Sequence, residues 1–247
     1  MPRYDFRTPR LYIASPLAEG REIALDRDQA NYLVNVLRLK RGDGVLLFNG
    51  CDGEWQAALA GEGRKSVSVV IGARTRPQPE AGDLDLLFAP LKHARLDYLV
   101  QKAVEMGVSR LRPTITKHTQ VERVNLERMQ ANVIVAAQQC GVLAVPDVAE
   151  PVAFDAAQAD EGRLLVFCDE DVGVKDPVAA LRGAPRGAPM AVLIGPEGGF
   201  SEEERARLAK RENVVRLSLG PRILRADTAA VAALALVQGV LGDWGGG

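Results

Sequence analysis

The chain has 247 residues, of which 47% are hydrophobic and 26% are charged, and its formal net charge is −1. That length accommodates one large or two modest domains, each able to bury a hydrophobic core. No apolar run approaches the roughly 20 residues of a membrane span, and the first residues contain no apolar core of a signal peptide. We therefore expect a cytoplasmic protein with no membrane segment.

The cysteines and histidines argue against disulfides and metal sites. Cys51, Cys140 and Cys168 are an odd number of cysteines, lie far apart and form no C-x-x-C pair. Such a pattern is typical of reduced thiols in the cytoplasm. His93 and His118 are the only histidines. Neither stands at ligand spacing from a cysteine or carboxylate, so we expect no metal.

Residues 10–75 have the pattern of a small β-rich domain. Short apolar stretches alternate with Gly-Asp, Asp-Gly and Gly-Glu-Gly turns, which favours a small barrel. The expected strands are 10–13, 22–25, 44–50, 54–59 and 66–71. Within residues 28–38, Tyr32, Leu33, Val36 and Leu37 stand at helical spacing, which predicts an amphipathic helix.

Basic residues are slightly in excess in this first part. Residues 1–76 contain twelve Lys and Arg against nine Asp and Glu, whereas the remainder contains nineteen against twenty-three. This bias is compatible with RNA contact, although an ordinary charged surface has the same balance.

A linker rich in Pro, Gly and charge (residues 76–83, RPQPEAGD) separates this part from the rest. Beyond it, strand and helix patterns alternate, which is typical of a parallel sheet with helices on both faces. We therefore predict an α/β fold with two domains, 1–76 and 83–247. The expected strands are 84–91, 111–116 and 163–170, and the expected helices include one ending at Gly107 and one over 126–140 closed by Gly141.

The stretch 191–204 (AVLIGPEGGFSEEE) organises the second domain. Its apolar start predicts a buried strand, Gly195-Pro196 ends that strand, and Ser201 with Glu204 predicts a capping box at a helix start. A strand, a glycine loop and a helix N-terminus in succession make backbone N–H groups available to a ligand. An ordinary βα turn has the same pattern, and the nucleotide motifs of P-loops and dinucleotide-binding folds are absent.

A second loop of the same kind follows at 214–221 (VVRLSLGP), and it leads into 222–229 (RILRADTA). Here we expect a second strand ending in Gly-Pro, and a final helix over 227–241 that is capped by Asp227 or Thr228. Two such loops at the carboxyl ends of neighbouring strands mark the crevice where open α/β sheets bind ligands.

Together, IGPEGGFSEEE and LSLGPRILRADTA closely resemble the SPOUT class of RNA methyltransferases, and within it the RsmE family of 16S rRNA uridine-N3 methyltransferases. The resemblance implies a PUA-like RNA-binding barrel followed by an α/β-knot domain. In that knot the apolar last helix is threaded through a loop and also contributes to a homodimer. It further implies S-adenosylmethionine as cofactor, and as substrate a uridine near the 3′ end of 16S rRNA within the assembled 30S subunit.

The resemblance also assigns residues to the two binding sites. For the cofactor it implies Ile194, Gly195, Glu197, Gly199, Leu217, Ser218, Leu219, Gly220 and Leu224. Glycines at these positions allow the backbone to come close to the cofactor, and the apolar side chains are suited to pack against its adenine ring. As contacts to RNA phosphates we expect Arg10, Arg38, Lys40 and Arg41, although each also suits an ordinary charged surface.

Methylation of uracil N3 requires loss of its proton or strong polarisation of the imide. We expect Arg225 to stabilise the developing uracil anion, because a guanidinium stays charged and forks toward carbonyl oxygens. Asp227 either orients Arg225, accepts the proton or only caps the last helix. Glu197 either takes part in catalysis or holds its loop through backbone N–H groups. The carboxylates of Asp169 and Glu170, at the end of a strand, are further candidates for the base.

Two departures from the family pattern separate the alternatives. Asp227 stands where the family usually has Glu, and Gln138 and Val142 stand where it commonly has an acid and an arginine. The three positions favour one alternative, a non-catalytic RNA-binding protein of ribosome assembly. A methyltransferase of the same class with another RNA target is a separate alternative. A phosphate-binding α/β protein is a fourth alternative.

Overall fold

The computed structural model describes residues 5, 7–61, 67–121, 123–158, 160–169 and 176–245. The chain forms two compact units. Unit 1 comprises Met1–Glu80 and Ala137–Val145, and unit 2 comprises Ala81–Ala136 and Pro146–Gly247. The return of 137–145 to unit 1 is a feature that the linear pattern of the sequence does not indicate. No described helix is both long and apolar enough to cross a membrane.

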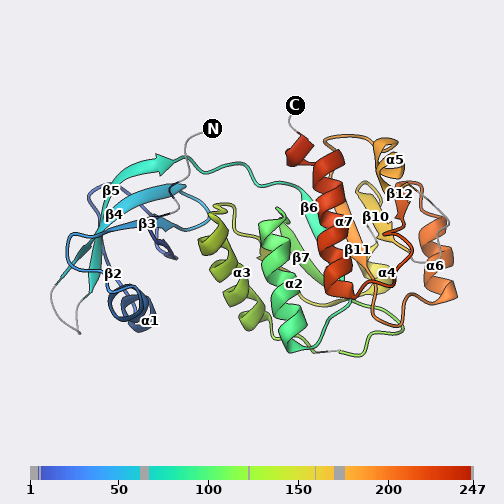
Figure 1. Ribbon diagram of the computed structural model, residues 1–247, viewed down its shortest axis with the longest axis horizontal. Helices are drawn as coiled ribbons and strands as arrows, with labels where there is room; N and C mark the ends of the chain where they lie inside the picture. The colour runs from blue at the N-terminus through green and yellow to red at the C-terminus, as the bar shows by residue number, and fades with distance from the viewer. Residues whose placement is uncertain are drawn as a thin grey trace. The chain divides into compact units, whose positions relative to one another are not determined.

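Unit 1 contains a curled five-stranded sheet (Figure 1) in the order β1-β3-β4-β5-β2. β1 pairs with β3 in parallel, and the other pairs are antiparallel. Its strands are β1 (Arg10–Tyr12), β2 (Glu22–Ala24), β3 (Gly44–Phe48), β4 (Glu54–Ala60) and β5 (Ser68–Arg76). All five lie where the sequence predicts strands, although β5 runs on to Arg76. Their inward side chains, such as Leu47 and Val69, form one buried core.

The helix expected over 28–38 is in fact two shorter pieces. α1 (Arg27–Ala30) has a capping box between Asp26 and Gln29, and a π-helix follows over Asn31–Val36. Because a π-helix has more residues per turn than an α-helix, it shifts the positions that face the core. Leu33 is fully buried as expected, but Val36 is 61% exposed.

The segment 137–145 is held to unit 1 by polar contacts. Gln138 Oε1 accepts a hydrogen bond from the Tyr12 backbone N–H at 2.9 Å, and the Gly141 carbonyl accepts one from Arg76 at 3.1 Å. The Gln138 amide oxygen therefore makes a structural contact at one of the three positions where the chain departs from the family pattern.

A buried carboxylate organises one end of the unit 1 sheet. Glu54 is 3% exposed. It accepts hydrogen bonds from Arg10 (2.9 Å), Arg76 (2.6 and 2.9 Å) and Thr75 (2.9 Å). Burial alone raises the pKa of Glu54, but these hydrogen bonds outweigh it, so the pKa lies below the usual value for glutamate.

This lowered pKa makes the stability of unit 1 depend on pH. A carboxylate with a lowered folded-state pKa stabilises the fold above its unfolded pKa of about 4.3, and that contribution is lost as the pH falls through the folded value. We expect the free energy of unfolding of unit 1 in urea to fall more steeply on acidification in the wild type than in Glu54→Gln. Trp55 fluorescence in a Trp244→Phe background measures this unfolding. Equal slopes below pH 5 would show that Glu54 is not the group responsible.

Unit 2 is built on a seven-stranded parallel sheet in the order β12-β10-β11-β6-β7-β8, with β9 also paired to β7. Its strands are β6 (Leu84–Phe88), β7 (Arg110–Ile115), β8 (Asp147–Val148), β9 (Val152–Ala153), β10 (Leu164–Cys168), β11 (Met190–Ile194) and β12 (Val214–Leu217). β6, β10 and β11 are buried along nearly their whole length, as expected for a sheet covered on both faces.

Helices cover this sheet, and α2 and α7 pack side by side (Figure 1). The helices are α2 (His93–Glu105), α3 (Leu126–Cys140), α4 (Phe154–Ala157), α5 (Pro177–Arg182), α6 (Glu202–Ala209) and α7 (Ala226–Val240). Leu87 and Leu193 pack against Phe154 of α4 and Leu208 of α6. Their sequence neighbours Leu86 and Val192 face the opposite side of the sheet, because side chains alternate along a strand. The short elements α4, α5, β8 and β9 are absent from the sequence prediction.

α7 is only partly covered within the chain. Ala230, Ala233, Leu234 and Val237 are buried, whereas its other apolar positions, among them Val231 and Leu236, are half-buried. A helix that is apolar on nearly every side must be covered all round, and the single chain does not provide that cover.

Candidate functional site

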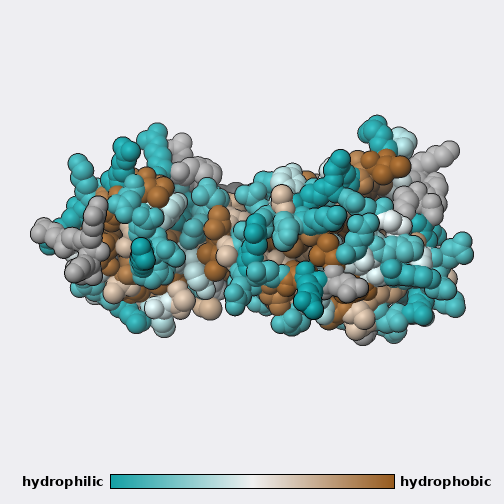
Figure 2. Space-filling view, turned by 90° about the horizontal axis from the view of Figure 1, so that it is seen from below, coloured by the Kyte–Doolittle hydropathy of each residue, from teal (hydrophilic) through white to brown (hydrophobic). Residues whose placement is uncertain are grey.

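The two Gly-Pro loops both lie at the carboxyl edge of the unit 2 sheet, as predicted. They do not follow neighbouring strands, however, because β10 lies between β11 and β12. Two interstrand spacings of ~4.8 Å place the starts of the loops about 10 Å apart. In the part of Figure 2 that shows unit 2, hydrophilic side chains predominate and hydrophobic ones lie between them.

The first loop, after β11, is a rigid turn. The Gly199 N–H donates to the Pro196 carbonyl at 2.9 Å, and Gly199 has φ 66°. A Cβ on Gly195 would stand 2.6 Å from the Phe200 ring, so only glycine fits there. The Ile194 carbonyl accepts from the Ala89 N–H at 3.1 Å. Several backbone groups of this loop are therefore already used within the protein.

The capping box predicted at the end of this loop is confirmed. Ser201 Oγ accepts from the Glu204 N–H, and Glu204 Oε2 accepts from the Ser201 N–H at 2.8 Å. Glu204 is only 7% exposed, and its other oxygen accepts from the Lys117 N–H at 2.8 Å. The helix cap thus also fixes the segment that follows β7.

His118 forms a second link between these two segments. Its Nδ1 lies 3.1 Å from the carbonyl oxygens of both Gly198 and Gly199. Two carbonyls only accept, so Nδ1 must carry the proton and donate it. The histidine therefore holds the glycine loop against the segment after β7, a role that the sequence prediction did not include.

The second loop, after β12, is open. No backbone hydrogen bond joins 218–224 to another residue that the structure describes. Gly220 has φ 97°, and Leu217, Leu219 and Leu224 supply apolar side chains that are buried or half-buried. Unbonded backbone groups beside apolar walls are what an adenosine-like group requires. The residues present therefore fit S-adenosylmethionine.

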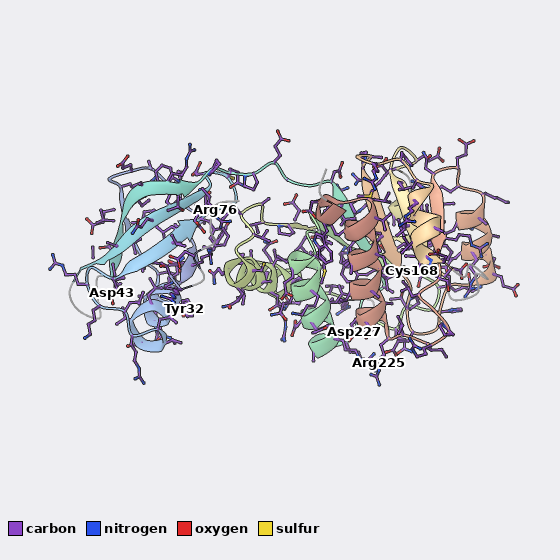
Figure 3. All side chains as sticks on the ribbon, turned by 45° about the horizontal axis from the view of Figure 1, so that its top comes forward. Tyr32, Asp43, Arg76, Cys168, Arg225 and Asp227 are labelled. Carbon is purple, nitrogen blue, oxygen red and sulfur yellow. The ribbon has the colours of Figure 1, made fainter. Side chains whose placement is uncertain are left out.

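Arg225 and Asp227 lie at the start of α7 (Figure 3). The expected cap is wrong: Arg225 itself is the N-cap residue with extended angles, and no side chain caps the helix. Asp227 Oδ1 accepts only from the Thr228 N–H, at 2.9 Å, and no Arg225–Asp227 ion pair is found among the described residues. The structure thus gives no support to the orientation of Arg225 by Asp227, and it leaves the Arg225 guanidinium exposed.

The other carboxylates considered for the base are engaged. Asp169 is 2% exposed and forms ion pairs with Arg205 at 3.0 Å and Arg216 at 2.6 Å, so its role is structural. Glu197 pairs with Arg95 of α2, and no contact to backbone N–H groups of its own loop is found among the described residues. Glu170 lies outside the described residues.

The four expected RNA contacts differ in their placement. Arg38, Lys40 and Arg41 are exposed in the loop of unit 1 that follows the π-helix, and Arg38 has φ 57°. Arg10 is 7% exposed and its guanidinium binds Glu54, because it belongs to the buried ion cluster of the sheet. This placement contradicts a surface role for Arg10, so we omit it from the RNA surface proposed below.

Cys168 lies at the end of β10 (Figure 3), and Asp169 follows it in the chain. Burial, together with the charge on Asp169, raises the pKa of the Cys168 thiol to about 12. Since the thiolate is the nucleophile, we expect iodoacetamide at pH 8 to modify the exposed Cys51 and to spare Cys168 in the folded protein. Peptide mass spectrometry measures both sites. Equal labelling would contradict this environment.

Sequence reasoning missed His118 and the residues around the start of α2. A usable signal existed, because Lys92 and His118 follow the strands β6 and β7, whose carboxyl ends lie at the same edge as the two loops. No group of three or more potential metal ligands occurs within the described part of the chain.

Comparisons with known proteins agree with this architecture. Residues 78–238 match the model of an RNA methyltransferase domain, and residues 25–72 match an RNA methyltransferase PUA domain. The chain thus belongs to the RNA methyltransferases that carry a PUA domain.

Relatives define the family more closely. The chain is 33% identical to the ribosomal RNA small subunit methyltransferase E of Rickettsia conorii over 93% of this chain and 94% of that protein. It therefore belongs to the ribosomal RNA small subunit methyltransferase E family.

Two solved structures are similar over 94% of this chain and 97% of theirs, each with a TM-score of 0.82. One is a methyltransferase of Legionella pneumophila, 30% identical, in complex with bound S-adenosylmethionine. The other is ribosomal RNA small subunit methyltransferase E of Neisseria gonorrhoeae, 27% identical, bound to the same molecule.

Proposed function

We propose that this protein is an S-adenosylmethionine-dependent methyltransferase that modifies N3 of a uridine near the 3′ end of 16S rRNA in the small ribosomal subunit. The observation that carries the proposal is the pair of loops at the carboxyl edge, one rigid and one with an unbonded backbone. Family membership and the S-adenosylmethionine-bound structures of two similar proteins support it.

The cofactor is held by the chain's own loops in this proposal. Leu217, Leu219 and Leu224 pack against the adenine, and backbone groups of 218–220 bind its polar edge. Ile194, Gly195, Glu197 and Gly199 form the opposite wall. When bound, S-adenosylmethionine supplies an electrophilic methyl group on a sulfonium centre.

The protein's contribution to the reaction is to orient uracil N3 and to favour its deprotonated form. Arg225 stabilises the negative charge that spreads onto the uracil oxygens as N3 loses its proton. Asp227 is the nearest carboxylate along the chain and is half-buried. We assign to it acceptance of that proton, directly or through water.

RNA binding falls to the exposed cations of unit 1. Arg38, Lys40 and Arg41 contact phosphates and so position the rRNA without reading its sequence. The half-buried apolar positions of α7 are where a second copy of the chain would pack, which is why we propose a homodimer. Threading of α7 through a trefoil knot remains a prediction from the resemblance.

The proposal is tested by the choice of acceptor. Small subunits, free 16S rRNA and large subunits from a strain deleted for this gene are each incubated with the protein and methyl-labelled S-adenosylmethionine. We expect label in the small subunit, less in free 16S rRNA and none in the large subunit. Label in transfer RNA would favour a methyltransferase with a second RNA target instead. Thermal stabilisation by S-adenosylmethionine without any methyl transfer would favour the non-catalytic RNA-binding protein.

A further inference from the structure

We infer that a pocket next to the first loop is the binding site for the acceptor nucleotide. The inference rests on the proposed function and adds the place where the RNA is held. An enzyme that modifies the N3 edge of a base must take that base out of pairing and hold it in a pocket. Such a pocket must adjoin the methyl donor, and the structure has one beside the first of the two loops assigned to the cofactor.

The pocket lies at the carboxyl ends of three adjacent strands, β11, β6 and β7. Of the two cofactor loops, one follows β11, beside the pocket, and the other follows β12, further along the same sheet edge and away from β6 and β7. The first loop is therefore shared, because Pro196 and Glu197 line the pocket and the same loop, Glu197 included, is assigned to the cofactor wall. Donor and acceptor thus meet at a single loop.

The shape and walls of the pocket suit one nucleotide. Its volume is about 260 Å³, just below the roughly 300 Å³ at which pockets for drug-sized ligands begin. Pro90, Leu91, Val121 and Pro196 provide apolar surface against which the face of a pyrimidine packs. A group of this size with a flat apolar face is a single base with its ribose, not an extended strand.

The polar rim suits the edge and the phosphate of that nucleotide. Gln120 supplies an amide that donates to a uracil carbonyl oxygen. Arg95 pairs with Glu197, which neutralises the one acidic group on the rim. Lys92 is exposed and makes no ion pair with any described residue, so one positive charge remains for one phosphate.

The walls are fixed in place before any ligand binds. His118 joins the Gln120 wall to the glycine loop, and the Lys117 backbone is tied to Glu204. Arg95 joins α2 to the same loop. A pocket whose three walls are held by such contacts does not have to form on binding, which lowers the cost of association.

The pocket is tested by binding of uridine 5′-monophosphate in the presence of S-adenosylhomocysteine, which has no methyl group to transfer. We compare the wild type with Lys92→Ala, with Lys92→Arg, and with Lys102→Ala as a control. Lys102 is on the same helix but outside the pocket, where it pairs with Glu105. Equilibrium dialysis with labelled nucleotide gives each Kd.

We expect Lys92→Ala to raise the Kd about tenfold, the effect of losing a hydrogen bond to a charged group. Lys92→Arg and Lys102→Ala should remain within about twofold of the wild type. With small subunits as substrate, the KM for RNA of Lys92→Ala should rise by a similar factor, while the KM for S-adenosylmethionine is unchanged.

Equal affinities of Lys92→Ala and Lys102→Ala for uridine 5′-monophosphate, or no saturable binding by the wild type, would overturn the assignment of the pocket as the acceptor site. Such a result leaves the proposed function to the acceptor experiment above, which does not depend on where the base is held. If the wild type binds the nucleotide through Lys92 but transfers no methyl to small subunits, the pocket stands and the assigned rRNA acceptor falls.

Discussion

Arg225→Ala should lower kcat for methyl transfer by about 10²- to 10³-fold, the effect of removing one donor that stabilises a developing anion. Because Arg225 is exposed and makes no ion pair with a described residue, its loss should leave the melting temperature unchanged. Affinity for S-adenosylmethionine should also be unchanged, since the assigned cofactor contacts come from other residues. Single-turnover kinetics on small subunits measures the methyl-transfer step directly.

Two further variants make this prediction more specific. Arg225→Lys keeps the positive charge but loses the paired N–H donors of the guanidinium, so it should recover only part of the methyl-transfer rate. Arg182→Ala removes an exposed arginine at the end of α5 and should behave as the wild type. If Arg225→Ala reacts at the wild-type rate, the uracil anion is stabilised by another group.

Asp85→Asn should destabilise unit 2 by about 3 kcal/mol, as expected when one partner of a buried ion pair is removed. Asp85 is 1% exposed and accepts hydrogen bonds from Arg110 at 2.6 Å and Arg112 at 3.2 Å, with Arg163 at 3.8 Å. Arg112 is largely buried and has no other ion pair among the described residues, so the variant leaves its guanidinium without a counter-charge, whereas Arg163 keeps Asp83 and Asp160. Urea unfolding in a Trp55→Phe background, where Trp244 is the remaining tryptophan, reports on unit 2.

Asp97→Asn is the matched control. Asp97 pairs with Arg128 at the surface, where such a pair contributes at most about 1 kcal/mol. A loss of stability in Asp85→Asn no larger than in Asp97→Asn would mean that the buried cluster is not what holds β6 to β7.

The elements that the sequence predicted correctly are those with local signals. The strands of both sheets other than β8 and β9, the helix over 126–140 and the capping box at Ser201 follow from apolar periodicity and from residues a few positions apart. The carboxyl edge as the place of the site follows from parallel topology, which alternating strands and helices already imply.

The errors arise where distant parts of the chain decide. The sequence does not show that β10 lies between β11 and β12. It also does not show that Asp169 and Arg10 form buried ion pairs with other residues. The predicted cap of α7 is wrong because Asp227 is a good cap by local preference, whereas the N-cap residue is Arg225, two residues earlier. His118 and Lys92 follow strands that end at the same edge as the two loops, but their place beside the first loop depends on the strand order, which the sequence does not show.

The most direct test of the whole account is the identity of the methylated nucleoside. Small subunits from a strain deleted for this gene are treated with the protein and methyl-labelled S-adenosylmethionine, and their RNA is digested to nucleosides for mass spectrometry. The account predicts labelled 3-methyluridine, lost when Arg225→Ala replaces the wild type. Label on a ribose, on a carbon of the base or on another nucleoside would contradict it.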